Sequence, residues 1–441
     1  MEKRRITELD GLRVLMIFVV SWYHIWQQSW LEPVIAVPAV GIRWSLDWLV
    51  RSGYVWVDGT VLLSAFLLYL PLTRQGRSEL KDIGDFYFRK AKRLLPGFWF
   101  ILLVFFFGMC LPWGLYKGDG PYMAKDLFTH FTLIFPFWRD TYIWTPLGAA
   151  PWTLSLVAQG YLLFPLLAKG MKKNPWWTLA ILIGLAFGFR AWCIWALNDY
   201  AMVVNCLANF LDVYAIGFAS ALLFAKLEKS NLGKRVQRDS DKKNPEERDQ
   251  RTRGSWGRFM WSPANSRALP DSSQGDHENR PRGPRTVCLH LLATIIFFGC
   301  LIGVCEMLKL QARSSGQVAI QEHQMMYRPV FALGFAGMIL SAPFMLKPLR
   351  WLLGNRVMVF LSSVSMSYYL IHQTLAVHLK RMGWPPSLTE TPNMAGEQPW
   401  QSQYTAAAFL ISLAAAIFVT YVVEKPVGKW LEKRRAKKKA A

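Results

Sequence analysis

The sequence GLRVLMIFVVSWYHIWQQSW, residues 11–30, decides the fold class of this chain. Arg13 is its only charged residue, and a run of roughly 20 mostly apolar residues is what a helix needs to cross a bilayer. The preceding residues, MEKRRITELD, lead into this run without a small-residue cleavage site. We therefore expect a first membrane-spanning helix and no cleaved signal peptide.

Long apolar stretches recur along the 441 residues, of which 53% are hydrophobic and 15% aromatic. This composition places the chain among membrane proteins. The predicted spans are about 11–30, 53–72, 97–115, 152–168, 176–197, 207–225, 287–308, 329–347, 356–379 and 404–423. A further apolar stretch, 127–138, is too short to cross alone and is predicted to be interfacial or re-entrant. The expected fold is an all-α polytopic membrane protein of about ten transmembrane helices.

The net charge of +22 would usually suggest a nucleic-acid partner, but its distribution argues against one. Lys and Arg cluster in short connections beside the spans, a positive-inside pattern that attraction to anionic lipid reinforces. The clusters are MEKRR at the start, Arg74, Arg77, Lys81, Arg89, Lys90, Lys92 and Arg93, then Lys169, Lys172 and Lys173, the segment 226–286, Lys347, Arg350 and Arg356, and EKRRAKKKAA at the end. With ten spans they all fall on one side, so both termini are predicted to be cytoplasmic. We expect a multi-pass plasma-membrane protein with membrane lipid as a partner and no nucleic acid.

Residues 226–286 differ from the rest in being rich in Asp, Glu, Arg, Ser, Asn and Pro. This composition predicts a disordered cytoplasmic insertion, with a docking site for an anionic partner as the alternative. The insertion divides the transmembrane core into residues 1–225, which include the interfacial or re-entrant segment, and residues 287–441, which end in the basic tail. The six cysteines show no CxxC or Cys/His spacing, so we expect neither a metal site nor a structural disulfide.

Ionisable side chains within spans are costly, which makes each one a candidate functional residue. Arg13 and His24 are eleven residues apart, almost three full turns, so they project in nearly the same direction about 16 Å apart along the helix axis. The alternatives are a snorkelling interface anchor for Arg13 and a satisfied core histidine for His24. Arg190 and Asp212 are expected to form a charge pair that fixes helix packing.

The predicted topology sorts the remaining polar residues into two groups. A cytoplasmic group could hold a phosphorylated donor, and it consists of Arg13, Arg89, Lys90 and Arg93. In an outer group an imidazole could act as a base, and it consists of His24, Asp58, Trp152, Ser155 and His372. A site divided in this way suits a reaction that draws on a cytosolic donor and serves an external acceptor.

Six motifs follow one another along the chain. They are ELDGLRVLMIFVVSWYHIW (8–26), VWVDGTVLLSAFLL (55–68), FYFRKAKRLLPGFW (86–99), PWTLSLVAQGYLLFPLL (151–167), VSMSYYLIHQTL (364–375) and VEKP (423–426). In this order, on about ten spans, they resemble the acyltransferase type 3 family of bacterial integral membrane O-acyltransferases.

The resemblance implies an acyl-CoA donor bound from the cytoplasm and a carbohydrate or glycolipid acceptor that faces outward. No permanently bound cofactor is expected. His24, Asp58, Ser155 and His372 become the candidate catalytic residues, and the cytoplasmic group becomes the candidate donor-binding site. A hydroxyl of an envelope polysaccharide or glycolipid is the expected acceptor, and acetyl is the expected acyl group.

One departure from the family pattern concerns the fourth motif, where Val157 and Ala158 replace the family's glutamates. If such a carboxylate orients the acceptor or the histidine, Asp58 is the acid that could substitute. Direct transfer and an acyl-histidine intermediate are both compatible with the sequence, whereas no GxSxG nucleophile elbow is present. A transporter or flippase of a small acylated or anionic solute, and an inactive relative, stay open as alternatives.

Overall fold

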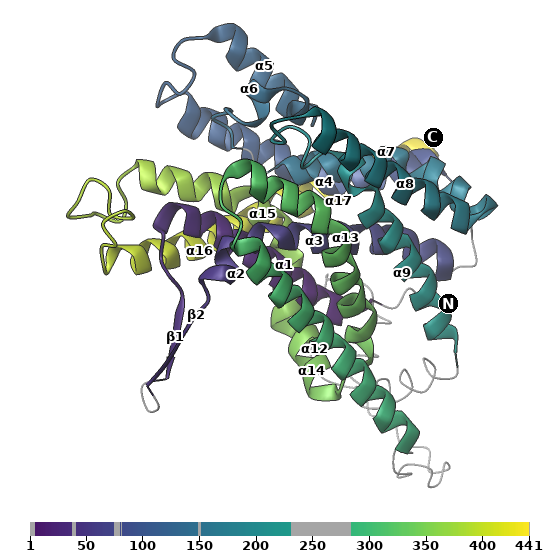
Figure 1. The fold of residues 1–441 in the computed structure, drawn as a ribbon. Coiled ribbons are helices and arrows are strands. Elements are labelled where there is room, and N and C mark those ends of the chain that lie inside the picture. The colour runs from purple at the N-terminus through teal and green to yellow at the C-terminus, as the bar shows by residue number, and fades with distance from the viewer. Residues whose placement is uncertain are drawn as a thin grey trace, which may run out of the picture.

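The computed structural model describes residues 5–37, 41–74, 80, 82–148, 151–230 and 284–440, and long helices make up most of them (Figure 1). Nine of these helices, with the short turns that continue them, are long and apolar enough to cross a membrane. They are α1 (Glu8–Ser29), α3 (Trp56–Arg74), α4 (Ile83–Phe105), α7 (Trp152–Lys173), α8 (Pro175–Ala196), α9 (Leu211–Lys229), α12 (Pro284–Ala312), α13 (Gln317–Ser341) and α16 (Trp400–Phe418).

A tenth long helix, α15 (Arg356–Arg381), lies between α1 and α16. Its 26 residues extend about 39 Å at about 1.5 Å per residue, more than the hydrocarbon core of roughly 30 Å. It is less apolar than the others because it carries His372, His378 and several Ser and Tyr side chains, and both histidines are buried. The prediction of an all-α polytopic protein with about ten spans is confirmed.

Short elements complete the described chain. They are β1 (Val34–Val37), β2 (Ile42–Ser45), α2 (Asp47–Arg51), η2 (Gly53–Val55), η3 (Phe106–Cys110), α5 (Gly120–Phe131), η4 (Phe135–Phe137), α6 (Arg139–Tyr142), η5 (Leu207–Phe210), η6 (Ala342–Phe344), α14 (Lys347–Gly354), η7 (Val419–Glu424) and α17 (Lys425–Ala440). The two strands form an antiparallel hairpin, with Ile35 opposite Trp44, which the sequence did not lead us to expect.

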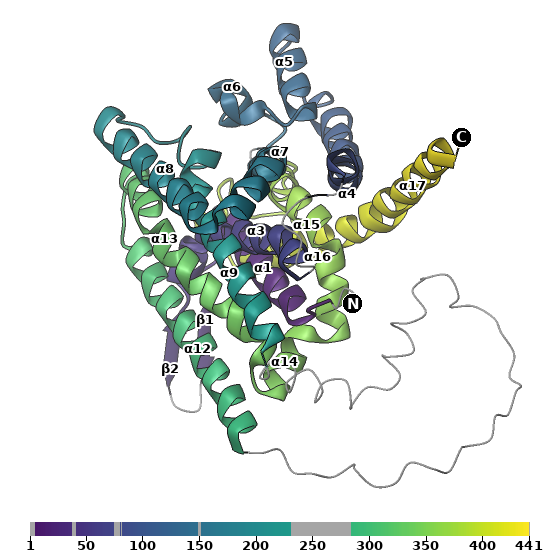
Figure 2. The same cartoon turned by 90° about the vertical axis from the view of Figure 1, so that its right-hand side faces the viewer.

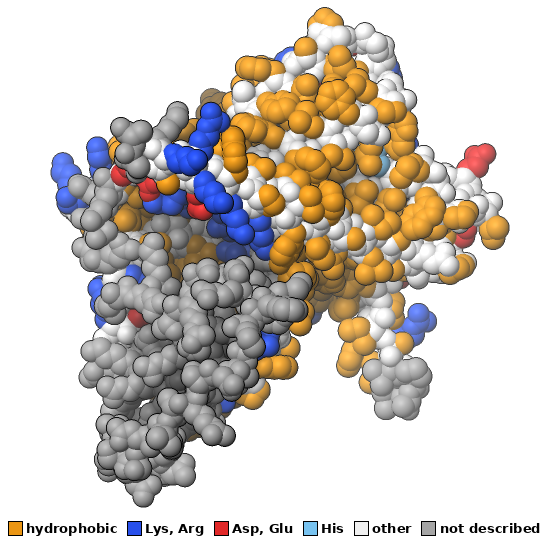
Figure 3. Space-filling view, turned by 180° about the vertical axis from the view of Figure 1, so that it is seen from behind, with side chains coloured by type: hydrophobic (Ala, Val, Ile, Leu, Met, Phe, Trp, Pro, Cys, Tyr) orange, Lys and Arg blue, Asp and Glu red, His pale blue; other side chains and the backbone are white. Residues whose placement is uncertain are grey.

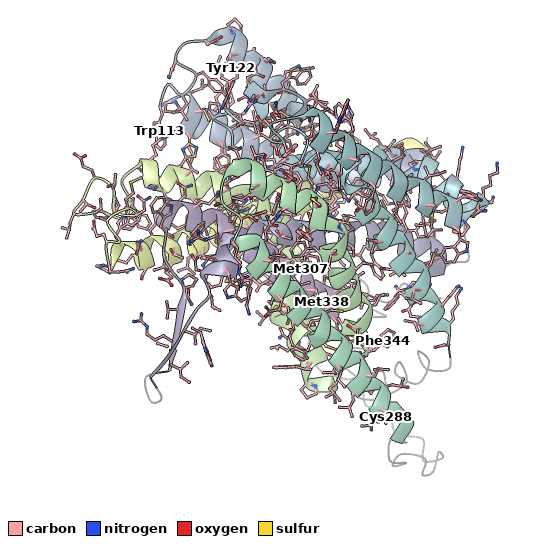
Figure 4. All side chains as sticks on the ribbon, in the orientation of Figure 1. Trp113, Tyr122, Cys288, Met307, Met338 and Phe344 are labelled. Atoms are coloured by element: carbon pink, nitrogen blue, oxygen red, sulfur yellow. The ribbon has the colours of Figure 1, made fainter. Side chains whose placement is uncertain are left out.

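The stretch 127–138, predicted not to cross the membrane, falls on the end of α5 and on η4. The 12 residues of α5 extend about 18 Å, too little for a crossing. Helices α5 and α6 form a lobe at one end of the bundle, where Figure 4 labels Trp113 and Tyr122. Trp113 packs edge-on against His378 of α15, with ring centroids 5.1 Å apart, so the lobe is fixed to the bundle.

Helix α1 lies at the centre of the bundle and packs against α3, α14, α15 and α16. One apolar core joins it to α3, α9 and α13, and a second joins it to α4, α15 and α16. Tyr369 of α15 packs against both cores. Met307 of α12 and Met338 of α13, labelled in Figure 4, lie where these two neighbouring helices meet the first core.

Two helices start earlier than predicted. Helix α4 begins at Ile83 instead of near 97, and the Asp82 carboxylate caps it by accepting a hydrogen bond of 2.9 Å from the Asp85 backbone N–H. The basic residues of the third motif therefore lie on a helix and not in a loop. Helix α13 begins at Gln317 instead of 329, which places Arg328 inside a helix.

The first and last described residues lie on the same side of the bundle (Figure 1). On the face shown in Figure 3, Lys and Arg gather toward this side while apolar side chains cover much of the rest. Figure 2 shows α17 projecting from the bundle on this side, where Arg435 pairs with Asp85 of α4 at 3.0 Å. The predicted insertion 226–286 begins in the last turn of α9, and residues 231–283 lie outside the described chain.

Candidate active site

Two histidines from different helices meet inside the bundle, His24 of α1 and His372 of α15. Their ring centroids are 5.3 Å apart and the rings are tilted by 48°. His372 is fully buried, whereas His24 is half-buried. The sequence placed both residues in the outer group, and the packing of α1 against α15 brings them together.

The orientation of the His24 ring is set by Gln27, one turn further along α1. Nδ1 of His24 lies 3.1 Å from Oε1 of Gln27. Because an amide oxygen only accepts, Nδ1 carries a proton, and in the neutral ring the lone pair is on Nε2. The Gln27 amide donates in turn to the Tyr23 hydroxyl at 2.9 Å, which holds its oxygen toward the histidine. Sequence reasoning missed Gln27, although its spacing of three residues from His24 on a helix is the signal for such a contact.

His372 has the same tautomer for a different reason. Its Nδ1 lies 2.8 Å from the backbone carbonyl oxygen of Tyr369 and 3.3 Å from that of Tyr368. Carbonyl oxygens only accept, so Nδ1 carries a proton and the lone pair of the neutral ring is again on Nε2. That nitrogen is buried and has no hydrogen-bond partner among the described residues. In the neutral form of each ring, Nε2 is therefore the basic nitrogen.

Asp58 and Ser155, the other two candidate catalytic residues, have different partners. Asp58 of α3 pairs with Arg328 of α13, whose Nε lies 3.3 Å from each carboxylate oxygen. Ser155 of α7 donates to the carbonyl oxygen of Leu133 at 2.5 Å and accepts from Gln159 at 3.1 Å. The structure thus does not bring either side chain into hydrogen bonding with an imidazole of the described chain.

Trp152, the remaining member of the outer group, packs against Phe210, with ring centroids 6.0 Å apart. Arg328 lies over the same Phe210 ring, with its guanidinium carbon 3.9 Å from the ring centroid. Arg328 was missed because the predicted span began at 329. The expected Arg190–Asp212 pair is confirmed, with two hydrogen bonds of 2.7 and 2.8 Å.

At the opposite end of α1, Arg13 belongs to a polar cluster that joins α1 to α15. Its Nη1 donates to the hydroxyl of Ser362 at 3.2 Å and lies 3.7 Å from Asp10. The Ser362 hydroxyl in turn donates to Asp10 at 2.9 Å. Aspartate and arginine of the first motif therefore act together in fixing this end of the bundle, and the Arg13 side chain keeps 23% of its surface exposed.

The other cytoplasmic-group residues lie along α4. Lys90 lies over the Tyr161 ring, 4.5 Å from its centroid, and Arg89 pairs with Asp85. Arg93 is exposed, has no ion pair or side-chain hydrogen bond to the rest of the described chain, and is within electrostatic range of Arg13. Arg93 is therefore the cation of this group best able to accept an anionic ligand.

Glu424 lies beside this basic group on η7, a π-helical turn in the last span. Its carboxylate accepts a hydrogen bond of 2.8 Å from Ser367 and lies against Gly97 of α4, where a Cβ would overlap it. It is also within electrostatic range of Arg93. Short π-helical turns within α-helices are frequent at functional sites, and this one places a carboxylate next to the basic group.

A family model described as an acyltransferase domain matches residues 6–425, nearly the whole chain. No curated protein and no solved structure matches. The resemblance drawn from the six sequence motifs is confirmed.

Proposed function

The chain belongs to the acyltransferase domain family, and on that premise we propose that it moves an acyl group, expected to be acetyl, from cytoplasmic acyl-CoA to a carbohydrate hydroxyl. The acceptor is an envelope polysaccharide, a glycolipid or a related carbohydrate that faces away from the cytoplasm. The protein is a multi-pass membrane acyltransferase, and we place it in the plasma membrane.

A single observation carries the proposal. His24 has a protonated Nδ1 held by Gln27 and an Nε2 that is free to act as a base, and it is half-buried next to His372. A general base must have its lone pair available toward the proton that it removes, and imidazole exchanges protons near neutrality. His24 meets this requirement, whereas Asp58 is neutralised by Arg328 and Ser155 is engaged with Leu133.

In the proposed reaction, Nε2 of His24 removes the proton of the acceptor hydroxyl as its oxygen attacks the thioester carbonyl. The carbon–sulfur bond breaks, and the proton passes from His24 to the departing CoA thiolate. The products are an ester and free CoA, so charge and protons balance without a further reactant. His372 lies beside His24 and is fully buried, and its proposed role is to limit the access of water to the site.

The donor is proposed to bind at the other end of α1. Arg13, Arg89, Lys90 and Arg93 supply positive charge for the phosphates of CoA, and Arg pairs well with phosphate oxygens. Arg13 and His24 are separated by about 16 Å along α1, on nearly the same face. A pantetheine arm that enters the bundle along this face would carry the thioester from the phosphate-binding end to the imidazole.

The direct test uses the purified protein in lipid nanodiscs with acyl-CoA labelled in the acyl group. Transfer of the label to an oligosaccharide or glycolipid fraction should require His24, and the His24→Gln variant should serve as the folded control. Mass spectrometry of envelope carbohydrate from wild-type and deletion strains identifies the acyl group and the acceptor together. If deletion leaves every carbohydrate mass unchanged, the proposed acceptor class is wrong.

A further inference from the structure

Arg328 and Arg190 are both buried arginines paired with an aspartate, but only one of them is fully satisfied. Arg190 donates to both carboxylate oxygens of Asp212, and also to the side-chain and backbone oxygens of Asn209, all at 2.7–2.8 Å. Its three nitrogens are all engaged. This pair is closed and needs no further ligand.

The Asp58–Arg328 pair is open by comparison, in the sense that one hydrogen-bond donor of its arginine has no partner in the described chain. Nε of Arg328 approaches both oxygens of Asp58 only to 3.3 Å, and Nη1 donates to the carbonyl oxygens of Val204 and Asn209 at 2.9 and 3.3 Å. Nη2 is buried and has no acceptor among the described residues. A buried N–H without an acceptor is unfavourable, so this group can donate to an oxygen that a ligand supplies.

An unpaired acceptor belongs to the residue next to one of these contacts. Asn205 follows Val204, whose carbonyl Arg328 holds, and its amide donates to the Tyr142 hydroxyl at 2.9 Å. Its Oδ1 is buried and has no donor in the described chain. The guanidinium that carries the unpaired donor therefore contacts the Val204 carbonyl, and the unpaired acceptor belongs to the next residue along the chain. A hydroxyl group, which can accept and donate at once, matches this combination.

The charge of the region favours an uncharged ligand. Arg328 and Arg190 are balanced by Asp58 and Asp212, and Asn209 links the two pairs through its backbone carbonyl. Because the cluster is neutral, an anion brought to it would lose its hydration without meeting a net opposite charge. Trp152, which packs against Phe210 and is only partly buried, is the aromatic side chain of this region that could contact the C–H face of a ring.

The cluster is connected to the histidine pair through two tyrosines. Tyr23, adjacent to His24 in α1, packs against Tyr54 with ring centroids 5.1 Å apart. Tyr54 lies one turn before Asp58, and its hydroxyl accepts from Gln311 at 2.7 Å. A ligand at Arg328 would therefore lie within a few side chains of His24.

We infer that Arg328 Nη2, with Asn205 Oδ1, forms a binding subsite for an uncharged, hydroxyl-bearing group, such as a neutral glycosyl unit. This inference rests on the proposed function, since it makes the subsite the place that holds the acceptor during acyl transfer. It adds that the group held there is neutral, and that Asp58 acts by positioning Arg328 and not as a base.

The test measures binding instead of transfer, so that its failure is distinct from failure of the proposed acyltransferase reaction. Saturation-transfer NMR is recorded on the full chain in lipid nanodiscs with three neutral probes, the methyl glycosides of glucose, galactose and mannose. Methyl glucuronide is the anionic probe. At least one neutral glycoside should receive saturation from the wild type, and the glucuronide should bind more weakly.

The paired variants make the outcome decisive. The double change Asp58→Asn with Arg328→Gln removes both charges together and should weaken the neutral glycoside by about tenfold or more, the loss expected for a hydrogen bond from a charged donor. The matched change Arg190→Gln with Asp212→Asn removes the closed pair at similar burial and should leave glycoside binding unchanged. Should the double variant not express, Asn205→Leu removes the acceptor alone and should weaken binding.

Three results would overturn the inference. They are no saturation of any neutral glycoside, stronger binding of the glucuronide, or equal losses from the open and the closed pair. Glycoside binding that is lost in the Asp58–Arg328 variant, in a protein that transfers no acyl group, would support the subsite and contradict the proposed reaction. Normal acyl transfer with unchanged glycoside binding in the Asp58–Arg328 variant would support the proposed reaction and contradict the subsite.

Discussion

Gly11 of α1 lies directly against the backbone of Leu353 in α14, so closely that a Cβ at position 11 would overlap the Leu353 carbonyl group. Because the obstacle is backbone, it cannot move aside by changing a rotamer. The glycine of the first motif is therefore required by packing, and it lets α14 close over the end of α1 that carries Arg13.

Gly11→Ala should destabilise the protein by about 1–3 kcal/mol, as expected for overpacking at a tight site. Gly184→Ala is the matched control, since Gly184 lies within α8 with open space where its Cβ would be. That control should be neutral or stabilising by up to about 1 kcal/mol, because alanine favours the helix. Thermal unfolding in nanodiscs compares the two, and equal midpoints would show that α14 moves aside freely.

The spans were largely predictable because the hydrocarbon thickness sets a minimum apolar length that the sequence displays directly. Helix starts were less predictable, because a helix continues past the hydrocarbon boundary wherever polar side chains are tolerated. The early starts of α4 and α13 are of this kind. The hairpin of β1 and β2 was missed because two strands of four residues leave little periodicity to detect.

The candidate site was predicted in its parts but not in its pairings. Burial cost identified His24, His372 and Asp58 as unusual, and helix geometry placed Arg13 and His24 on one face. Which residues meet across helices depends on packing that one sequence does not display. Arg328 was missed because the predicted span began at 329, twelve residues after the start of α13. Gln27 was missed because ionisable groups were considered before neutral amides.

The proposed topology is tested by reporter fusions at described positions. A fusion after Lys229 should report the cytoplasm, because basic connections stay on that side. Fusions at Gly118, Gly148 and Gly316 should report the opposite side. The first two bracket the lobe built from α5, η4 and α6, and opposite signals from them would mean that this lobe crosses the membrane.

Donor binding is expected to depend more on Arg93 than on Arg89. Arg93→Gln removes an exposed cation without an ion-pair partner in the described chain, whereas Arg89 is already paired with Asp85. Loss of hydrogen bonds to a phosphate should raise the KM for acyl-CoA by about tenfold or more. Arg89→Gln should have a smaller effect. The comparison is made at low and high salt, and equal KM values for both variants would refute the assignment.

Gln27 is predicted to be a positioning residue for His24. Gln27→Leu removes the acceptor for Nδ1 while preserving much of the volume, so the imidazole can adopt the wrong tautomer or turn away. We expect kcat to fall by about tenfold while the KM for acyl-CoA is unchanged, since misplaced catalytic groups lower the chemical step. Tyr23→Phe, which only releases the Gln27 amide, should have a weaker effect of the same kind. A raised KM with normal kcat would assign Gln27 to substrate binding instead.

The catalytic role proposed for His24 gives the sharpest prediction. His24→Ala should lower acyl transfer by roughly 10²–10⁴-fold, the range for a positioned general base, while expression and membrane insertion stay normal because alanine suits a helix. His24→Gln keeps hydrogen-bonding capacity and much of the volume but cannot exchange a proton, so it should be nearly as inactive. His372→Gln is the informative comparison, because that residue lies 5.3 Å away, measured between ring centroids, but is fully buried. It should reduce the rate less, since the half-buried imidazole is the one that an acceptor can reach. Near-normal activity of His24→Gln together with a large loss in His372→Gln would exchange the two roles and move the base to α15.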